Sequence, residues 1–398
     1  MQILESTTPD HVAGAASPSP SVIEMIERFI SFPTVSRDSN LGLIEWTRDY
    51  LKGLGVTSRL TYDQSGKKAN LFATLGEERD GGLILSGHTD VVPVDGQAWD
   101  TDPFRVTMRD GRMYGRGTAD MKGFLATALA LAPEFVERGG PTPLHFAFSY
   151  DEEVGCIGVR GLIADLKEQW IAPAGCIVGE PTEMRPIIAH KGTHRFRCCV
   201  RGKEAHSSAP NRGVNAIEYA AKLIVRIREI AERLAVEEEK NFNFTIPYST
   251  LQTGTVHGGI ACNIVPRDCE FQFELRTLPG TDASMLYREI QTYAEILSAA
   301  MQNEAPGTGI SLAAITSTPG LQMREEDAVV KLAMALARKP ANGGVSYGTE
   351  AGLFQHAGIP TVICGPGSID QAHRPNEYVS LDQIAQCEAF LRRLVAKS

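Results

Sequence analysis

A chain of 398 residues is too long for one ordinary hydrophobic core, so the sequence predicts more than one domain. Its 43% hydrophobic and 22% charged residues are typical of a globular protein and exclude a largely disordered chain. A formal net charge of -9, without any Lys/Arg run, argues against a nucleic-acid-binding protein.

The chain opens with a segment rich in Ser, Pro and Ala, which predicts a flexible N-terminal tail over residues 1–20. This segment lacks the basic start and the apolar stretch of a signal peptide. The longest strongly apolar run, residues 124–132, is about half the length that crosses a bilayer. The cysteines show no paired spacing. We therefore expect reduced thiols, a cytoplasmic protein and no membrane partner.

Residues 21–192 and 318–398 are expected to alternate between helices and short buried strands. Apolar residues recur at helical spacing after Ser21, which forms a capping-box pattern with Glu24. Further helices are predicted at residues 44–54 and 121–132, and another opens at Glu350. Short apolar runs between helices are typical of a largely parallel sheet. The predicted strands are 83–85, 144–148, 176–178 and 361–364.

Residues 193–317 show a different pattern. Alternating side chains predict strands at 193–201, 250–256, 269–276 and 310–315, and amphipathic stretches predict helices at 213–235 and 282–300. The order strand, helix, strand, strand, helix, strand is that of a ferredoxin-like βαββαβ fold. We therefore predict an α/β protein in which this domain is inserted into a discontinuous catalytic domain, residues 21–192 and 318–398.

Imidazole and carboxylate side chains follow the ends of all four predicted buried strands. They are His88, the pair Glu152 and Glu153, Glu180, and His373 after a Gly-Pro-Gly turn. Because ligand-binding residues of open α/β sheets gather beyond the carboxyl ends of the strands, these side chains are expected to meet. Together with Asp120 they have the composition of a metal site.

The residue types also divide by chemistry. Two histidines and three carboxylates can hold two divalent ions if one carboxylate bridges them. Glu152 is the acidic residue that remains, and beside two cations it is suited to act as the general base. Asp90, two residues after His88, is placed to accept the second ring N–H and so fix the tautomer.

Each residue also has a simpler explanation. His88 and His373 could be surface or loop histidines, Asp120 could be a helix N-cap, and the two adjacent glutamates could be solvated. Glu180 and Asp90 could be turn residues. The shared position of these residues at one edge of the sheet favours the metal site. The simpler explanations would require each of these residues to lie at that edge by chance.

Five stretches make the sequence resemble the M20 metallopeptidase family. They are 86–93 (SGHTDVVP), 114–123 (YGRGTADMKG), 149–155 (SYDEEVG), 178–182 (VGEPT) and 365–378 (GPGSIDQAHRPNEY). Within the family the sequence is similar to the group of acetylornithine deacetylases and succinyl-diaminopimelate desuccinylases, and more to the former. The resemblance implies two divalent ions per subunit, zinc with cobalt as a possible substitute, and a homodimer formed through the inserted lid domain.

The resemblance also implies residue roles. Asp120 would bridge the two ions, His88 and Glu180 would complete one site, and Glu153 with His373 would complete the other. The base, which later donates a proton to the leaving amine, would be Glu152, and the residue that orients His88 would be Asp90.

In the inserted domain, the segment 203–210 (KEAHSSAP) resembles the family segment whose histidine supports the oxyanion, here His206, in the same chain or across the dimer. Asn263 and Arg276 resemble residues that bind the substrate's amide and carboxylate. The simpler explanations are a surface-loop histidine, a turn amide and a surface charge.

The segment Thr349-Glu350-Ala351 resembles the deacetylase group, and Glu350 could pair with a distal ammonium of the substrate. A favourable charge at a helix N-terminus explains Glu350 about as well. Two features depart from the deacetylase pattern: Gly348 stands where a cysteine is expected, and the segment around Asn263 is closer to the desuccinylases.

The expected activity is hydrolysis of an N-acyl amino acid, with N2-acetyl-L-ornithine as the leading substrate. Within the family, a desuccinylase, another deacylase, a dipeptidase or a carbamoylase are alternatives. A metal-stabilised binding protein without turnover is the alternative from another class. The sequence retains Glu152 together with all the proposed ligands. This argues against a binding protein without turnover, since an inactive site is expected to lose the base first.

Overall fold

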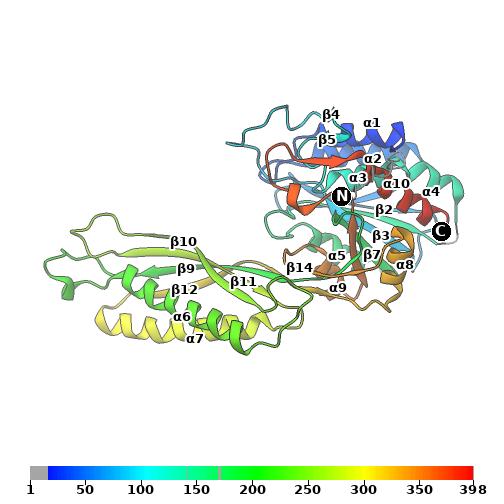
Figure 1. Cartoon of the computed structure of the whole chain (residues 1–398). Helices are drawn as coiled ribbons and strands as arrows, with labels where there is room; N and C mark the ends of the chain where they lie inside the picture. The colour runs from blue at the N-terminus through cyan, green and yellow to red at the C-terminus, as the bar shows by residue number, and fades with distance from the viewer. Residues whose placement is uncertain (1–16, 141, 169–171, 398) are drawn as a thin grey trace, which may run out of the picture.

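The structure of the protein is a computed structural model that describes residues 17–140, 142–168 and 172–397. Residues 1–16 of the predicted tail lie outside the described residues. The predicted fold class is confirmed: a mainly parallel sheet flanked by helices is accompanied by a separate antiparallel sheet with its own helices (Figure 1). Among the described residues, no helix is long and apolar enough to cross a membrane.

The central sheet has nine strands in the described part of the chain. Their order is β1-β2-β6-β3-β7-β15-β8-β13, and β14 pairs with β8. The middle neighbours β6, β3, β7 and β15 run parallel to one another. The strands are β1 (Ser58–Tyr62), β2 (Ala69–Leu75), β3 (Leu83–His88), β6 (Leu144–Ser149), β7 (Gly175–Pro181), β8 (Ile187–His190), β13 (Leu321–Gln322), β14 (Asn342–Val345) and β15 (Thr361–Gly365).

Alternate side chains of these strands pack into two cores on opposite faces of the sheet. Leu71 and Ala73 of β2 join one core, and Phe72 between them joins the other. The helices of the first core are α1 (Pro20–Ile30), α2 (Leu41–Gly53), α3 (Lys122–Ala130), α4 (Ala132–Arg138), α8 (Ala328–Ala337) and α10 (Leu381–Val395). The second core is covered by α5 (Val159–Glu168) and α9 (Ala351–His356).

Two helix starts differ from the sequence-based expectation. Helix α1 begins at Pro20 with Ser19 at the N-cap, not at Ser21, because the fixed φ of proline suits the first helical turn. The helix predicted at 121–132 is divided into α3 and α4 at Leu131, and the N-cap of α3 is Met121 rather than Asp120.

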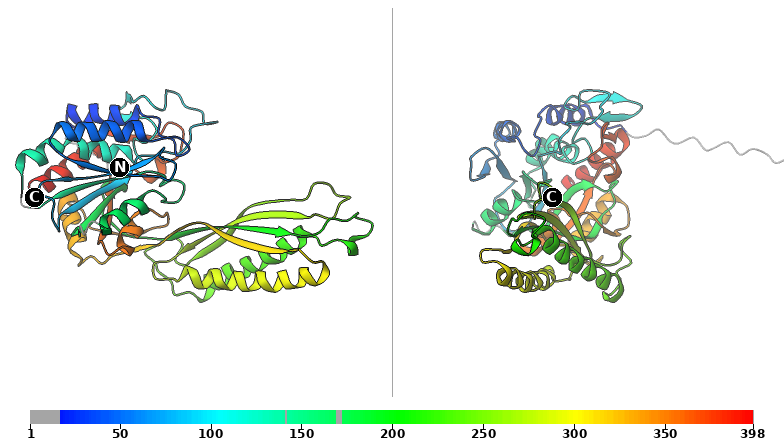
Figure 2. Two further views of the ribbon diagram at one scale, coloured as in Figure 1. Left: turned by 180° about the vertical axis from the view of Figure 1, so that it is seen from behind. Right: turned by 90° about the vertical axis from the view of Figure 1, so that its left-hand side faces the viewer.

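A second unit extends from the main body as an arm (Figures 1 and 2). Its four strands are all antiparallel in the order β10-β11-β9-β12, and they pack on α6 and α7 to form a core of their own. The elements are β9 (Gly192–Arg201), α6 (Ala216–Glu237), β10 (Thr250–Gly258), β11 (Asp268–Thr277), α7 (Ala283–Glu304) and β12 (Gly309–Thr318). They occur in the expected βαββαβ order, whereas the domain limits 193–317 remain a prediction.

A small third sheet joins two segments that are far apart in sequence. Strand β16 (Tyr378–Ser380) pairs with β5 (Arg112–Tyr114), which pairs with β4 (Thr107–Arg109). The pairing places the segment that follows His373 beside the segment that leads to Asp120.

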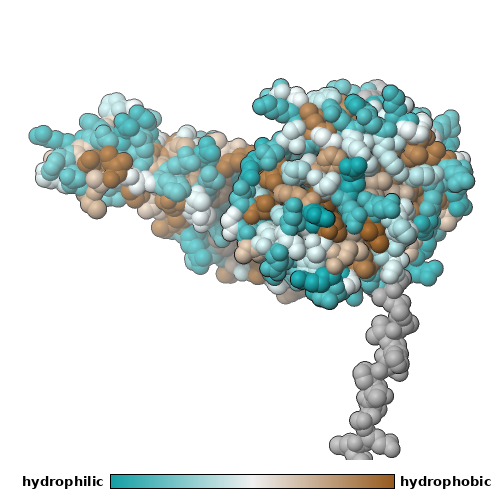
Figure 3. Space-filling model, turned by 90° about the horizontal axis from the view of Figure 1, so that it is seen from above, coloured by the Kyte–Doolittle hydropathy of each residue, from teal (hydrophilic) through white to brown (hydrophobic). Residues whose placement is uncertain are grey.

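The surface seen from above is largely hydrophilic, with separate hydrophobic patches on the arm and the main body (Figure 3). Several exposed apolar side chains belong to the arm. They include Val256, Ile260, Met285 and Ile296.

Candidate metal centre

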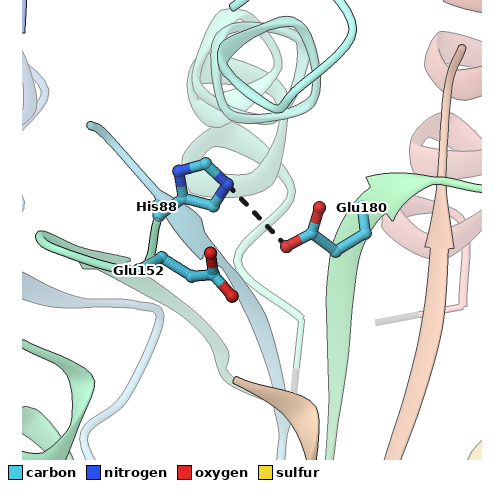
Figure 4. A group of neighbouring side chains, drawn as sticks. All are labelled: His88, Glu152 and Glu180. Carbon is cyan, nitrogen blue, oxygen red and sulfur yellow. Dashed lines mark ion pairs between the residues drawn. The ribbon is translucent and has the colours of Figure 1, made fainter. Parts of the chain in front are cut away.

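The carboxyl ends of β6, β3 and β7 bring three ligand-type side chains together. His88 is the last residue of β3, Glu180 lies near the end of β7, and Glu152 follows β6. In Figure 4 the imidazole of His88 and the carboxylates of Glu152 and Glu180 point toward a common space. The His88 Nε2 atom lies 3.8 Å from Glu180 Oε1, and both side chains are buried. The strand order therefore produces the convergence expected from the sequence.

Asp120 lies between the two histidines. Its Oδ1 is 3.0 Å from His88 Nε2, and its Oδ2 is 3.3 Å from His373 Nε2. The carboxylate thus faces one histidine with each oxygen, which is the arrangement that a ligand bridging two cations requires. Since Met121 is the N-cap of α3, the helix-cap explanation for Asp120 is not supported.

Glu153 completes the group on the His373 side. Its Oε2 is 3.0 Å from His373 Nε2. The His373 side chain is 53% exposed, whereas the Asp120 and Glu153 side chains are 7% and 8% exposed. This half of the centre therefore opens to solvent and to an entering substrate.

Two sets of ligand atoms are close enough to hold a metal ion. One is His88, Glu152 and Glu180, the other is His88, Asp120 and Glu153, and in each set the atoms lie within 4.8 Å of one another. Imidazole nitrogen and carboxylate oxygen are donors that suit zinc and related divalent ions. The donor set therefore fits a dinuclear metal centre, and Glu152 is near enough to touch whatever is bound there.

The ionisable groups show the electrostatic strain of crowding carboxylates without cations. Burial raises the pKa of Glu152 to about 8 and that of Glu180 well above its usual range. Hydrogen bonds to Asp120 and Glu153 raise the pKa of His373 to about 10. Divalent ions bound here would offset the repulsion between the carboxylates and displace the protons.

Asp90 contacts His88, but through a different atom from the one expected. The sequence predicts that the Asp90 carboxylate accepts the ring N–H of His88. The nearest acceptor to His88 Nδ1 is the main-chain oxygen of Asp90 at 2.8 Å, while the carboxylate Oδ1 is 3.6 Å away. The carboxylate accepts hydrogen bonds from Ser36 Oγ (2.7 Å) and from the backbone N–H of Glu152 (3.1 Å). Asp90 therefore contacts both the imidazole and the loop that carries Glu152.

The expected contact of Glu350 with a substrate ammonium group needs correction. Glu350 is fully buried, and its two carboxylate oxygens accept hydrogen bonds from Ser86 Oγ (2.6 Å) and Ser149 Oγ (2.7 Å). These serines lie on β3 and β6. Because no part of its surface reaches solvent, Glu350 supports the strands beneath the centre, and the structure does not place it in the cleft described below.

A cleft of about 170 Å³ lies between the candidate metal centre and the arm, and residues of both line it. Arg276 lines this cleft, donating to Glu274 Oε1 at 2.6 Å and to the main-chain oxygen of Ser346 at 3.1 Å. Arg195 also lines it and was not singled out from the sequence, although the alternation of β9 places it on the open face of the sheet. The lining residues also include Glu152, Glu153, Thr316, Tyr347, Gly348 and His373.

His206 and Asn263 lie together at the far end of the arm. The backbone N–H of Ser207 donates to the main-chain oxygen of Asn263 at 3.0 Å, and both residues are exposed. Strand β9 leads from the cleft to this end, and ten extended residues cover roughly 30 Å. The structure therefore does not bring His206 or Asn263 to the metal cluster of the same chain.

Two further side chains at the centre were not identified from the sequence. Cys156 donates through Sγ to Glu152 Oε1 at 3.1 Å. Glu377 is buried and contacts the loop that carries Asp120. Glu377 lies within the stretch 365–378, four residues after His373, so its position in that stretch was the available signal.

Comparisons with known proteins agree with this geometry. Residues 84–397 match the family described as Peptidase family M20/M25/M40. An acetylornithine deacetylase of Pasteurella multocida is 36% identical over 386 residues, which are 95% of this chain and 98% of that protein. One from Photorhabdus laumondii is 35% identical over 383 residues, 94% of this chain and 97% of that protein.

Among solved structures, the M20 family metallo-carboxypeptidase Sso-CP2 from Sulfolobus solfataricus superposes with a TM-score of 0.73. The superposition covers 95% of this chain and 99% of that chain at 18% sequence identity, so the likeness shows a shared fold. With the family match and the near-full-length relatives, the conclusion is that this chain belongs to peptidase family M20/M25/M40 and is a metallo-amidohydrolase.

Proposed function

We propose that the protein hydrolyses N2-acetyl-L-ornithine to L-ornithine and acetate, using two divalent ions, zinc in the native enzyme and cobalt as a substitute. The observation that carries the proposal is the position of Asp120, with one carboxylate oxygen facing His88 and the other facing His373. Substrate identity is inferred from relatives named acetylornithine deacetylase that are aligned over nearly the whole chain. We further propose a cytoplasmic role in arginine biosynthesis, to which L-ornithine belongs.

In this proposal Asp120 bridges the ions. His88 and Glu180 complete one site, and Glu153 and His373 complete the other. The ions would polarise the amide carbonyl and lower the pKa of water. This division follows the contacts, since His88 is near Glu180 and His373 is near Glu153.

Glu152 is the proposed general base and acid. Its carboxylate lies at the edge of the cleft and close to the ligand atoms, so it can accept a proton from the attacking water. It then returns the proton to the departing nitrogen. Asp90, which contacts His88 and the backbone of Glu152, is proposed to hold both in place.

Arg276 is proposed to bind the substrate's carboxylate, because a guanidinium that lines the cleft can form two parallel hydrogen bonds with it. We propose that His206 and Asn263 act from a second copy of the chain, since each lies at the outer end of the arm. The Nδ1 atom of His206 accepts from the backbone N–H of Ser208 at 3.2 Å. This leaves Nε2–H as the donor that an oxyanion needs.

The proposal is tested by removing metal from the protein, reconstituting it with zinc or cobalt, and assaying a substrate panel. The panel contains N2-acetyl-L-ornithine, N-succinyl-diaminopimelate, N-carbamoyl amino acids and dipeptides. We expect the highest kcat/KM for N2-acetyl-L-ornithine and no turnover without metal. A higher kcat/KM for another class would assign the protein to that branch of the family, and full activity of metal-free protein would overturn the mechanism.

A further inference from the structure

Glu377 is a buried carboxylate in the loop between His373 and β16, and no role has been given to it so far. Its Oε1 atom accepts three main-chain hydrogen bonds, from the N–H groups of Gly117 (3.0 Å), Ala119 (2.9 Å) and Asp120 (3.1 Å). Three donors that converge on one oxygen fix the path of the loop. Because this loop carries Asp120, the carboxylate of Glu377 fixes the backbone position of that proposed bridging ligand.

The other oxygen of Glu377 is connected to His373. Glu377 Oε2 accepts a hydrogen bond from Arg116 NH1 at 2.7 Å, and their side chains are 0% and 1% exposed. The second terminal nitrogen, Arg116 NH2, donates to Gln97 Oε1 at 2.7 Å, and Gln97 Nε2 donates to the main-chain oxygen of His373 at 2.9 Å. Arg116 NH1 also lies 3.3 Å from the main-chain oxygen of Arg374.

The three side chains Glu377, Arg116 and Gln97, named here the Glu377 network, are poorly explained by stability alone. Removing an ion pair from water costs free energy that apolar side chains of similar size would not incur. The buried Arg116 Nε atom also has no hydrogen-bond partner among the described residues. A costly and incompletely satisfied pair is better explained by the geometry that it imposes.

We propose that Glu377 is a positioning residue that, through Arg116 and Gln97, holds Asp120 and His373 at the positions needed to bind one metal ion. This ion, bound by Asp120, Glu153 and His373, is called the second ion, and the ion bound by His88, Glu180 and Asp120 is called the first. The inference rests on the proposed dinuclear function. The network contacts the segments of the two ligands on the exposed side of the centre. The ligands that belong to the first ion alone, His88 and Glu180, lie on β3 and β7 and receive none of the hydrogen bonds described above, whereas Asp120 is shared by the two ions.

Selective loss of one ion is therefore the expected effect of Glu377→Gln. The amide keeps the size of the side chain, but it removes the charge opposite Arg116 and weakens acceptance of the main-chain hydrogen bonds. We expect the affinity for the second Co²⁺ to fall about 10- to 100-fold and the affinity for the first to change much less. Metal-depleted full-length protein is titrated with Co²⁺, and bound metal is measured by elemental analysis together with the visible absorption of each Co²⁺.

Glu388→Gln is the matched control. Glu388 is also a buried carboxylate paired with an arginine, Arg392, at 2.8 Å, but it lies on α10 and bonds to the backbone of Ser19. This variant should bind both Co²⁺ ions as the wild type does. A purely structural role for Glu377 would instead lower the thermal stability of the Glu377 variant and reduce its affinity for both Co²⁺ ions equally.

Gln97→Ala tests the same idea if Glu377→Gln does not fold, because it removes the hydrogen bond to His373 and leaves the hydrogen bond between Arg116 and Glu377 in place. This variant should have a lower affinity for the second Co²⁺ and an unchanged affinity for the first. Wild-type affinity for both ions in the folded variant would overturn the inference. If the wild type itself binds fewer than two ions, the proposed dinuclear centre fails instead, so the two failures are distinguishable.

Discussion

At the scale of single residues, the centre gives different properties to carboxylates that lie side by side. Burial alone would raise the pKa of Asp120, but hydrogen bonds to His373 and His88 hold it well below the usual range. Glu152 accepts a hydrogen bond from the Cys156 thiol rather than from a histidine, and burial raises its pKa to about 8. This contrast suits a permanently ionised bridging ligand and a group that takes up and releases a proton.

Glu152→Gln should lower kcat by about 10²- to 10⁴-fold while both metal ions remain bound, because the amide cannot carry the proton. The measurement is steady-state kinetics with N2-acetyl-L-ornithine, combined with metal analysis of the variant. Glu137→Gln, an exposed position on α4, serves as the control and should retain wild-type kcat. Near-normal turnover of the Glu152 variant would assign the proton transfer to another group.

Metal affinity should fall as the pH is lowered. In the metal-free centre the pKa of His373, raised to about 10 by hydrogen bonds to Asp120 and Glu153, means that this proposed ligand holds a proton at neutral pH. A divalent ion must displace this proton, so binding releases it and the affinity falls as the pH is lowered below about 10. Calorimetry in two buffers of different ionisation enthalpy measures this release, and pH-independent binding without proton release would contradict the account.

At the scale of elements, the parallel strands deliver the ligands and helix α3 packs closely behind them. Gly179 of β7 allows this approach, since an added Cβ would lie 2.0 Å from the buried ring of Phe124 on α3. The next residue along β7 is Glu180, so any shift of the strand moves a proposed ligand.

Gly179→Ala should therefore lower the free energy of unfolding by about 1–3 kcal/mol through overpacking, and it should also weaken metal binding. Chemical denaturation and Co²⁺ titration provide the two measurements. The control is Gly53→Ala at the end of α2, where nothing lies within 4 Å of the added Cβ, and its stability should match or slightly exceed the wild type. Equal stability of the two variants would show that β7 can move without cost.

Sequence patterns predicted the elements that carry the ligands but missed several others. The strands before His88 and Glu180 are nearly all apolar, so their burial and their parallel arrangement were predictable. Strands of three residues, such as β5 and β16, are too short to show a pattern, and their pairing depends on contacts distant in sequence. The burial of Glu350 was not predictable, because a polar residue's identity does not reveal that two serines will satisfy it.

At the scale of the whole molecule, the arm separates residues that the family resemblance assigns to one reaction. His206 and the candidate metal centre lie at opposite ends of β9, so under the proposed role of His206 a single chain would supply an incomplete site. A two-fold dimer could complete both sites, with each arm serving the partner's cleft. The exposed apolar side chains Val256 and Ile260 near the outer end of the arm are candidates for burial in such a dimer.

This arrangement predicts complementation between two inactive variants. Glu152→Gln and His206→Ala should each be nearly inactive alone, but co-expressed chains would form mixed dimers with one of two sites intact, so the purified mixed dimers should have about half of wild-type activity. The assay is deacetylation by separately tagged, doubly purified dimers. Activity that stays at the level of the single variants would indicate that His206 does not act across the dimer.

The central claim is that His88, Asp120, Glu153, Glu180 and His373 share a pair of cations. The most direct measurement is a crystal grown with zinc and an anomalous difference map recorded at the zinc absorption edge. The account predicts two peaks flanking the Asp120 carboxylate, one beside His88 and Glu180 and the other beside Glu153 and His373. A map with no peak at Asp120, or with zinc bound only at other side chains, would contradict it.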